Sequence, residues 1–188
     1  RLVFFDTSST SATARSITVS VTDSTGLVSN SAVSTISILG SGNSPVIDLD
    51  ANNSSGASGT SYQGVFTLTR SAVAIGDLDV SITDSDSTNL TGATITISAG
   101  KDVTDLLAIS GSLPVGISAV AYNSTTGVLA LSGSASLASY QAAIEAIRFS
   151  TSGTSTSART INVTVTDGTN TSNIAVSTIS INRPPTLD

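Results

Sequence analysis

The sequence predicts an all-β protein made of antiparallel β-sandwich repeats with one short helix. Of its 188 residues, 36 are Ser and 28 are Thr, and they alternate with Val and Ile along several segments. Such alternation gives strands with one dry and one wet face. Thr suits the wet face, because its branched β-carbon fits the pleat while its hydroxyl stays hydrated. Turn signals at short intervals then favour an antiparallel sandwich.

The expected strands follow from this alternation in chain order. In the strand expected from Leu78 to Ile82, inward-facing apolar residues leave Asp77 and Asp79 facing solvent at the start of the strand. The inward positions are Ile17, Val19 and Val21; Phe66 and Leu68; Leu78, Val80 and Ile82; Ala93, Ile95 and Ile97; and Ile161, Val163 and Val165. Turn signals separate these segments at residues 24–26, 84–92, 126–127 and 167–168.

One helix is predicted at residues 137–147. Leu137, Tyr140, Ile144 and Ile147 recur at helical spacing, and Ser136 stands at the position of an N-cap. We expect this helix to pack on the edge of the sandwich, just before a strand at Arg148. Its tyrosine is interpreted as a core residue.

An internal repeat sets the domain organisation. Three segments of the chain recur, with only Ser, Thr and Asn exchanged in the longest one: 14–23 at 158–167, 32–38 at 175–181, and 45–48 at 185–188. The last match gives a period of about 140 residues, typical of a tandem array. We therefore predict the C-terminal part of a preceding repeat at 1–43, a complete repeat at 44–182 and the start of a following repeat at 183–188.

Charge and composition exclude several classes of protein. The chain has no His, Cys, Met or Trp, and its net charge is −6. Ser/His and Cys/His catalysis, thiol chemistry and disulfides are therefore excluded, and we do not expect an enzyme. Nucleic acid and anionic membrane surfaces are poor partners without a basic cluster. Apolar runs are far shorter than the ~20 residues of a spanning helix, so membrane insertion is not expected.

The candidate functional residues are aspartates spaced two apart. They form the pairs Asp48 and Asp50, Asp77 and Asp79, and Asp84 and Asp86. Ca²⁺ takes six to eight oxygen ligands, and in extended chain residues i and i+2 point the same way. The pairs therefore predict Ca²⁺ binding, although the interpretation that loop aspartates only cap turns and keep the surface soluble stays open.

The three pairs are not expected to form a single site. Asp77 and Asp79 precede a strand, whereas Asp84 and Asp86 follow it in a loop. In an immunoglobulin-like sandwich this loop and the one after Asp167 lie where the chain enters the domain, near residues 45–50. A Ca²⁺ ion at that end would clamp successive repeats together.

Three segments, 112–117, 123–129 and 165–168, carry a family resemblance that extends over residues 44–188. In this order they resemble the cadherin-like and dystroglycan-type tandem repeats of large bacterial surface adhesins. The resemblance implies a secreted, Ca²⁺-stiffened rod at the cell surface that presents an adhesive tip or binds matrix polysaccharide. The pair Asp84 and Asp86 carries over from the family pattern, but the linker at 40–45 lacks the Asp/Asn-rich ligand string of cadherins.

The predicted function is accordingly structural and adhesive, and the predicted location is outside the cell. The expected partners are neighbouring repeats of the same chain or polymer, with surface glycans or matrix as a further possibility. One alternative is a self-assembling subunit of a surface layer or filament, in which strands near the ends pair with neighbours. Another is a Ca²⁺-dependent polysaccharide-binding module, although Tyr62, Tyr122 and Tyr140 are the only aromatic rings of the kind that stack on sugars.

Overall fold

A computed structural model describes residues 14–36, 42–68 and 71–184. The chain divides into two compact units, Arg1–Gly42 and Asn43–Asp188. Most of the predicted start of a following repeat, at residues 185–188, lies outside the described residues.

The first unit contains an antiparallel hairpin of β1 (Arg15–Val19) and β2 (Ala32–Ile36). The strand predicted around Ile17 is therefore present. Its predicted dry face is not buried, because Val19 is 53% and Val21 66% exposed. In the described part of this unit, no second layer of strands covers that face.

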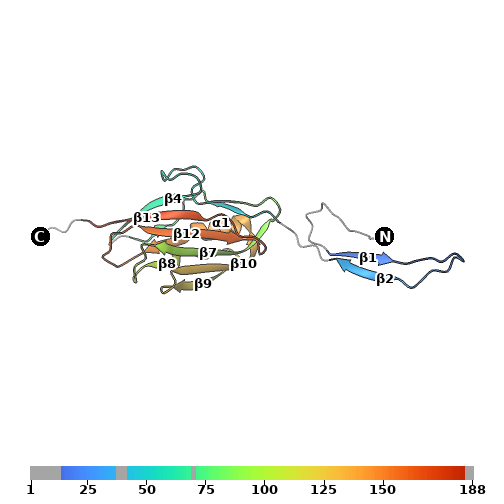
Figure 1. Cartoon of the computed structure of the whole chain (residues 1–188). Helices are drawn as coiled ribbons and strands as arrows, with labels where there is room; N and C mark the ends of the chain where they lie inside the picture. Colours follow the sequence, from blue (N-terminus) through green and yellow to red (C-terminus); the bar gives the residue numbers. More distant parts are fainter. Residues whose placement is uncertain (1–13, 37–41, 69–70, 185–188) are drawn as a thin grey trace. The chain divides into compact units, whose positions relative to one another are not determined.

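The second unit is built on a six-stranded sheet in the order β4, β13, β12, β7, β10, β9 (Figure 1). All neighbouring strands are antiparallel except β4 and β13, which are parallel. Residues alternate between buried and partly exposed along β12 and β13, so one face of the sheet is dry. The strand bounds are β4 Tyr62–Thr67, β7 Asn89–Ala99, β9 Ser118–Asn123, β10 Val128–Ser136, β12 Arg159–Thr166 and β13 Ala175–Asn182.

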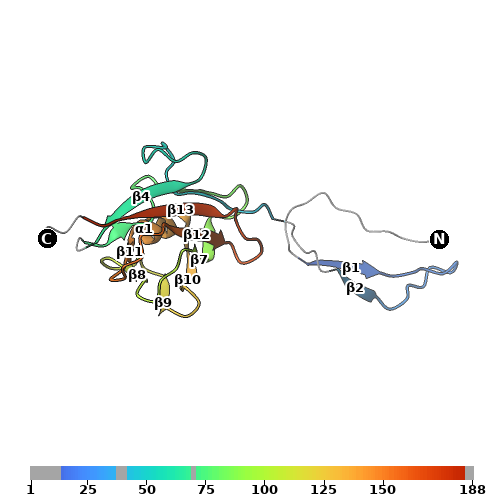
Figure 2. The ribbon, with the colours of Figure 1, turned by 60° about the vertical axis from the view of Figure 1, so that its left-hand side comes forward.

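A second layer covers this dry face. Figure 2 shows α1, β8 and β11 together on one face of the large sheet. The layer contains β5 (Val73–Ala74), β11 (Ile147–Ser150) and β8 (Leu106–Ile109), together with the pair β3 (Val46–Asp48) and β6 (Ser81–Thr83). Phe66 of β4 meets Phe149 of β11 edge to face, with ring centroids 5.7 Å apart, and both rings are buried. The predicted all-β sandwich with one short helix is confirmed.

The helix α1 (Leu137–Glu145) begins and ends close to its predicted bounds. Ser136 caps it by accepting a hydrogen bond from the Ser139 amide at 3.1 Å. Tyr140 is fully buried and donates its hydroxyl proton to the Gly133 carbonyl at 2.7 Å, which confirms it as a core residue. The predicted C-terminal turn is wrong, because Ile147 already belongs to β11.

The strand predicted from Leu78 to Ile82 is shorter than expected. Val80 and Ile82 are buried, but Leu78 is 83% exposed because residues 78–79 form a turn and β6 starts only at Ser81. The prediction that Asp77 and Asp79 face solvent from a strand is therefore wrong. Both lie in the turn between β5 and β6 and are partly buried.

Candidate metal site

The register of β3 and β6 determines where the predicted aspartates lie. The two strands are antiparallel, with Val46 opposite Thr83 and Asp48 opposite Ser81. This pairing brings the loop after Asp48 beside the loop before Ser81 at one end. At the other end it brings Asn43 close to Asp86, and the Asn43 amide donates to Asp86 Oδ1 at 3.0 Å.

Asp50 is fully buried at the start of the loop between β3 and β4. Its Oδ1 accepts the Ser54 amide and its Oδ2 accepts the Ser55 amide, both at 2.9 Å. The tight loop that makes this possible passes through Asn53, whose φ of 55° is a left-handed conformation that asparagine tolerates well. Asp50 therefore organises the loop while its carboxylate stays inside the protein.

Asp77 and Asp79 come from the loop between β5 and β6. The Asp77 amide donates to the Leu49 carbonyl at 2.8 Å, which ties the two loops together. The Ser54 hydroxyl donates to Asp77 Oδ2 at 2.6 Å, and the Asn52 amide donates to Asp79 Oδ2 at 3.0 Å. The other oxygen of Asp79, Oδ1, is buried and has no hydrogen-bond partner in the described structure.

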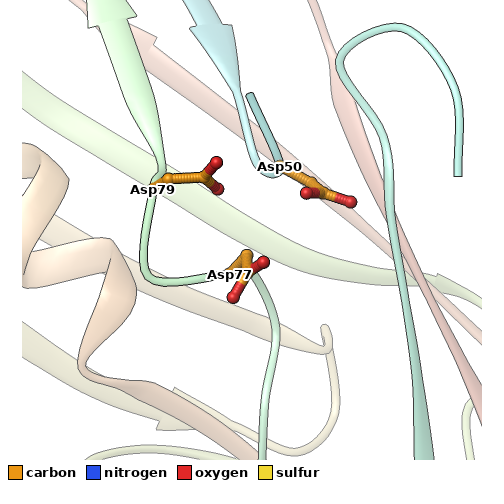
Figure 3. Close-up of side chains that lie close together, drawn as sticks. All are labelled: Asp50, Asp77 and Asp79. Atoms are coloured by element: carbon orange, nitrogen blue, oxygen red, sulfur yellow. The ribbon is translucent and has the colours of Figure 1, made fainter. Parts of the chain in front are cut away.

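Asp50, Asp77 and Asp79 converge, as Figure 3 shows. Each offers a carboxylate oxygen, and these oxygens all lie within 4.8 Å of one another. In the described part of the chain, the donors that hydrogen-bond the three carboxylates are neutral backbone amides and serine hydroxyls. An unneutralised carboxylate cluster of this kind can hold a hard metal ion, which prefers oxygen ligands.

The site has a negative electrostatic potential. Burial works to raise the pKa of Asp50, but the hydrogen bonds from Ser55 and Ser54 outweigh it and hold the pKa below its usual value. Burial and then the charges of Asp79 and Asp77 raise the pKa of Glu145. Burial and then the charges of Asp77 and Asp50 raise the pKa of Tyr62, against an opposing effect of Arg148. Asp50 thus remains ionised at neutral pH. The charges of the three aspartates make ionisation of the nearby Glu145 and Tyr62 less favourable.

The predicted pairs are rearranged in the structure. Asp48 does not join the cluster; its Oδ1 accepts the Asp50 amide at 3.0 Å in a local turn. Of the three pairs, only Asp77 and Asp79 contribute both members to the cluster, where they combine with Asp50. The partnership could not be found from the i, i+2 spacing, because the cluster is created by the pairing of β3 with β6.

Asp84 and Asp86 lie at the other end of β6 from the cluster. Asp84 Oδ1 accepts the amides of Asp86 and Ser87 at 3.1 and 3.2 Å. Burial, the Asp84 carboxylate and the charge of Asp167 raise the pKa of Asp86, which the Asn43 amide partly opposes. Asp84, Asp86 and Asp167 were expected near the entering chain, and they lie near one of its residues, Asn43. They do not lie near Asp48 and Asp50, because β3 carries these two residues to the opposite end of β6.

Comparison with protein-family models, curated proteins and solved structures finds no match for this chain. Among the described residues, no helix is long and apolar enough to cross a membrane. The fold and the site together define an all-β sandwich unit with an acidic cluster that can hold a metal ion.

Proposed function

We propose that the chain is a Ca²⁺-stabilised structural repeat of an extracellular, cell-surface adhesive protein. The observation that carries the proposal is the convergence of Asp50, Asp77 and Asp79 from two loops, with oxygens within 4.8 Å of one another. The internal repeat and the Ser/Thr-rich, weakly charged composition support the structural and adhesive role.

Ca²⁺ fits the donor set better than other common metals do. The three ligands are carboxylates, whereas Zn²⁺ and Cu ions favour the nitrogen and sulfur ligands of His, Cys and Met, which this chain lacks. Mg²⁺ demands near-ideal octahedral geometry and retains its water, while Ca²⁺ accepts irregular sets of carboxylate and carbonyl oxygens. A site built from two irregular loops therefore favours Ca²⁺.

The bound ion would act as a cross-link between the loop after β3 and the loop before β6. It would neutralise repelling carboxylates, among them Asp79, whose Oδ1 is buried and unpartnered in the described structure. Because the ion binds the folded state and not the unfolded chain, it stabilises the fold by about 2.7 kcal/mol when its concentration is 100 times Kd. Extracellular Ca²⁺ modules typically bind with a Kd of about 10⁻⁴ to 10⁻³ M.

The test is thermal unfolding of the 188-residue chain in EDTA, in Ca²⁺ and in Mg²⁺, with direct measurement of Ca²⁺ binding by calorimetry. We expect Ca²⁺ to raise the melting temperature of the second unit more than Mg²⁺ does, and D77N and D79N to remove most of that rise. D23N is the matched control, because Asp23 also accepts loop amides but belongs to the first unit. Equal melting curves in Ca²⁺ and EDTA for the unaltered chain would overturn the proposal.

A separate arm addresses the second acidic pair. The variant D84N/D86N should retain the Ca²⁺ response if the ion binds at Asp50, Asp77 and Asp79. Loss of the response in this variant alone would move the site to the other end of β6.

A further inference from the structure

The hairpin of the first unit repeats the hairpin of β12 and β13 in register as well as in sequence. Arg15 pairs with Ile36 as Arg159 pairs with Ile179. At the other end of the strands, Val19 pairs with Ala32 as Val163 pairs with Ala175. The two connecting loops differ in length by one residue, so the shared register is a property of the strands.

The equivalence extends past the strands. The Ser29 amide donates to the Val21 carbonyl at 2.8 Å, and the Val21 amide donates to Ser29 Oγ at 3.0 Å. In the second unit, Ser172 and Val165 make the same two hydrogen bonds at 2.9 and 3.0 Å. The two hairpins are therefore built alike from strand to turn.

Their surroundings differ. In the second unit β12 pairs with β7 and β13 pairs with β4, and Val163 and Val165 are 0% and 1% exposed. The equivalent Val19 and Val21 are 53% and 66% exposed. Removing apolar side chains from water is favourable, so the exposed face of β1 and β2 has a tendency to become buried.

Asn173 and Arg159 show how the hairpin of the second unit binds the rest of its sandwich. Asn173 binds both backbone groups of Ile47, accepting from its amide at 2.9 Å and donating to its carbonyl at 3.0 Å. Arg159 is fully buried against Asp105. Asn30 and Arg15 occupy the equivalent positions in the first hairpin. The position of Asn30 therefore indicates that the partner offers an entering strand like β3.

We propose that β1 and β2 form the closing hairpin of a second sandwich, and that their partner is a β-sandwich body of the same type as residues 43–157. This body supplies strands like β7 and β4 on either side of the hairpin and a strand like β3 against Asn30. The inference concerns packing only and is independent of metal binding.

The test supplies this body in the same chain. A second copy of residues 43–157 replaces residues 1–13, so that its last residue precedes Ala14 as Ser157 precedes Ala158 in the unaltered chain. Because the protein has no cysteine, V19C can be labelled alone and its rate of thiol labelling reports its burial. V33C is the control, because Val33 is 64% exposed and its equivalent, Val176, stays partly exposed on the outer face of β13.

We expect V19C to label roughly tenfold or more slowly in the extended chain than in the 188-residue chain, with a much smaller change for V33C. Equal slowing of both cysteines, or fast labelling of V19C in the extended chain, would overturn the proposal. Protection of V19C in the 188-residue chain that increases with protein concentration would also overturn it, because the partner would then be a second copy of this chain.

Discussion

Arg159 and Asp105 form an ion pair in which both side chains are fully buried. Arg159 Nε lies 2.8 Å from Asp105 Oδ2, and Arg159 Nη2 donates to Asp105 Oδ1 at 3.2 Å. Arg159 Nη1 donates to the Ser157 carbonyl, and Asp105 Oδ2 also accepts the Asp102 amide. The pair thus joins the start of β12 to the loop before β8. Its geometry is bidentate, the arrangement in which a buried ion pair best offsets the desolvation of its charges.

Removing one member of this pair should be more destabilising than removing both. R159M or D105N leaves a buried group without its partner, and each should cost about 3 to 5 kcal/mol of unfolding free energy. The double variant D105L/R159M buries neither charge and should therefore cost less than either R159M or D105N alone. Urea denaturation of the second unit measures these differences. R15M, at the equivalent position of the first hairpin, is the control and should leave this transition unchanged; additive losses in the double variant would contradict the coupling.

Asp79→Asn should change the stability of the second unit in opposite directions with and without Ca²⁺. Carboxylate oxygens of Asp50, Asp77 and Asp79 lie within 4.8 Å of one another, a distance at which two unit charges repel by about 1 to 3 kcal/mol. D79N keeps an oxygen for the Asn52 amide but removes this repulsion, so the variant should be more stable in EDTA. In saturating Ca²⁺ it should be less stable, because a ligand is lost. Chemical denaturation in both buffers checks the reversal, and a change of the same sign in both would exclude a metal site here.

The pH dependence of metal-free stability should have two opposing parts. Asp86 has a raised pKa and binds its proton more tightly in the folded state, so lowering the pH from 7 stabilises the fold through this group. Hydrogen bonds from the Thr104 amide and hydroxyl lower the pKa of Asp102, so its contribution is present above the unfolded-state pKa and is lost as pH falls through the folded-state value. Stability should first rise and then fall on acidification.

Two substitutions separate these contributions. D86N should be more stable than the unaltered chain at pH 7 and should lose the initial rise, since its amide oxygen can still accept the Asn43 amide. D102N should be less stable at pH 7, and its deficit should disappear at low pH. Melting curves in EDTA at a series of pH values test both variants. If stability still rises initially on acidification of D86N, the rise belongs to another group, such as Glu145.

Alternation alone was sufficient to predict much of the fold. The buried positions Ile95, Ile97, Ile161 and Val163 follow from period-2 patterning, because the sheet has one dry face. Leu78 was mispredicted because it lies between two aspartates in the turn at residues 78–79, and this arrangement mimics the alternation at the start of a strand. The buried Arg159 was also missed, since a charged residue at the start of a strand gives no sign that Asp105, 54 positions away, lies opposite it.

The candidate site was predictable only in its residue types. Spacing identified the aspartates as candidate ligands, but the cluster depends on the pairing of β3 with β6, which brings the loop after Asp48 beside the loop before Ser81. Register between strands that are more than 30 residues apart depends on the whole sandwich and not on local sequence. Asp48 has the same spacing from Asp50 as Asp77 has from Asp79, yet it caps a turn.

The Asn173 side chain binds the backbone of β3 in the way that a neighbouring strand would. Its Oδ1 accepts the Ile47 amide and its Nδ2 donates to the Ile47 carbonyl, while Ile47 itself is fully buried. N173A would leave two buried backbone groups without partners, at about 1 to 3 kcal/mol each. We therefore expect a loss of about 2 to 6 kcal/mol in the unfolding free energy of the second unit.

The first hairpin offers a matched control for this variant. N30A removes the same side chain from the equivalent position and should leave the unfolding of the second unit unchanged. N173D keeps the acceptor for the Ile47 amide but places a carboxylate oxygen against the Ile47 carbonyl, where Nδ2 donates in the unaltered chain. Because two acceptors then repel each other, its loss should be at least as large as that of N173A. Denaturation midpoints and hydrogen exchange at the Ile47 amide measure both effects. An Ile47 amide that stays protected in N173A would mean that the pairing of Ile47 with Ile82 holds β3 in place without the asparagine.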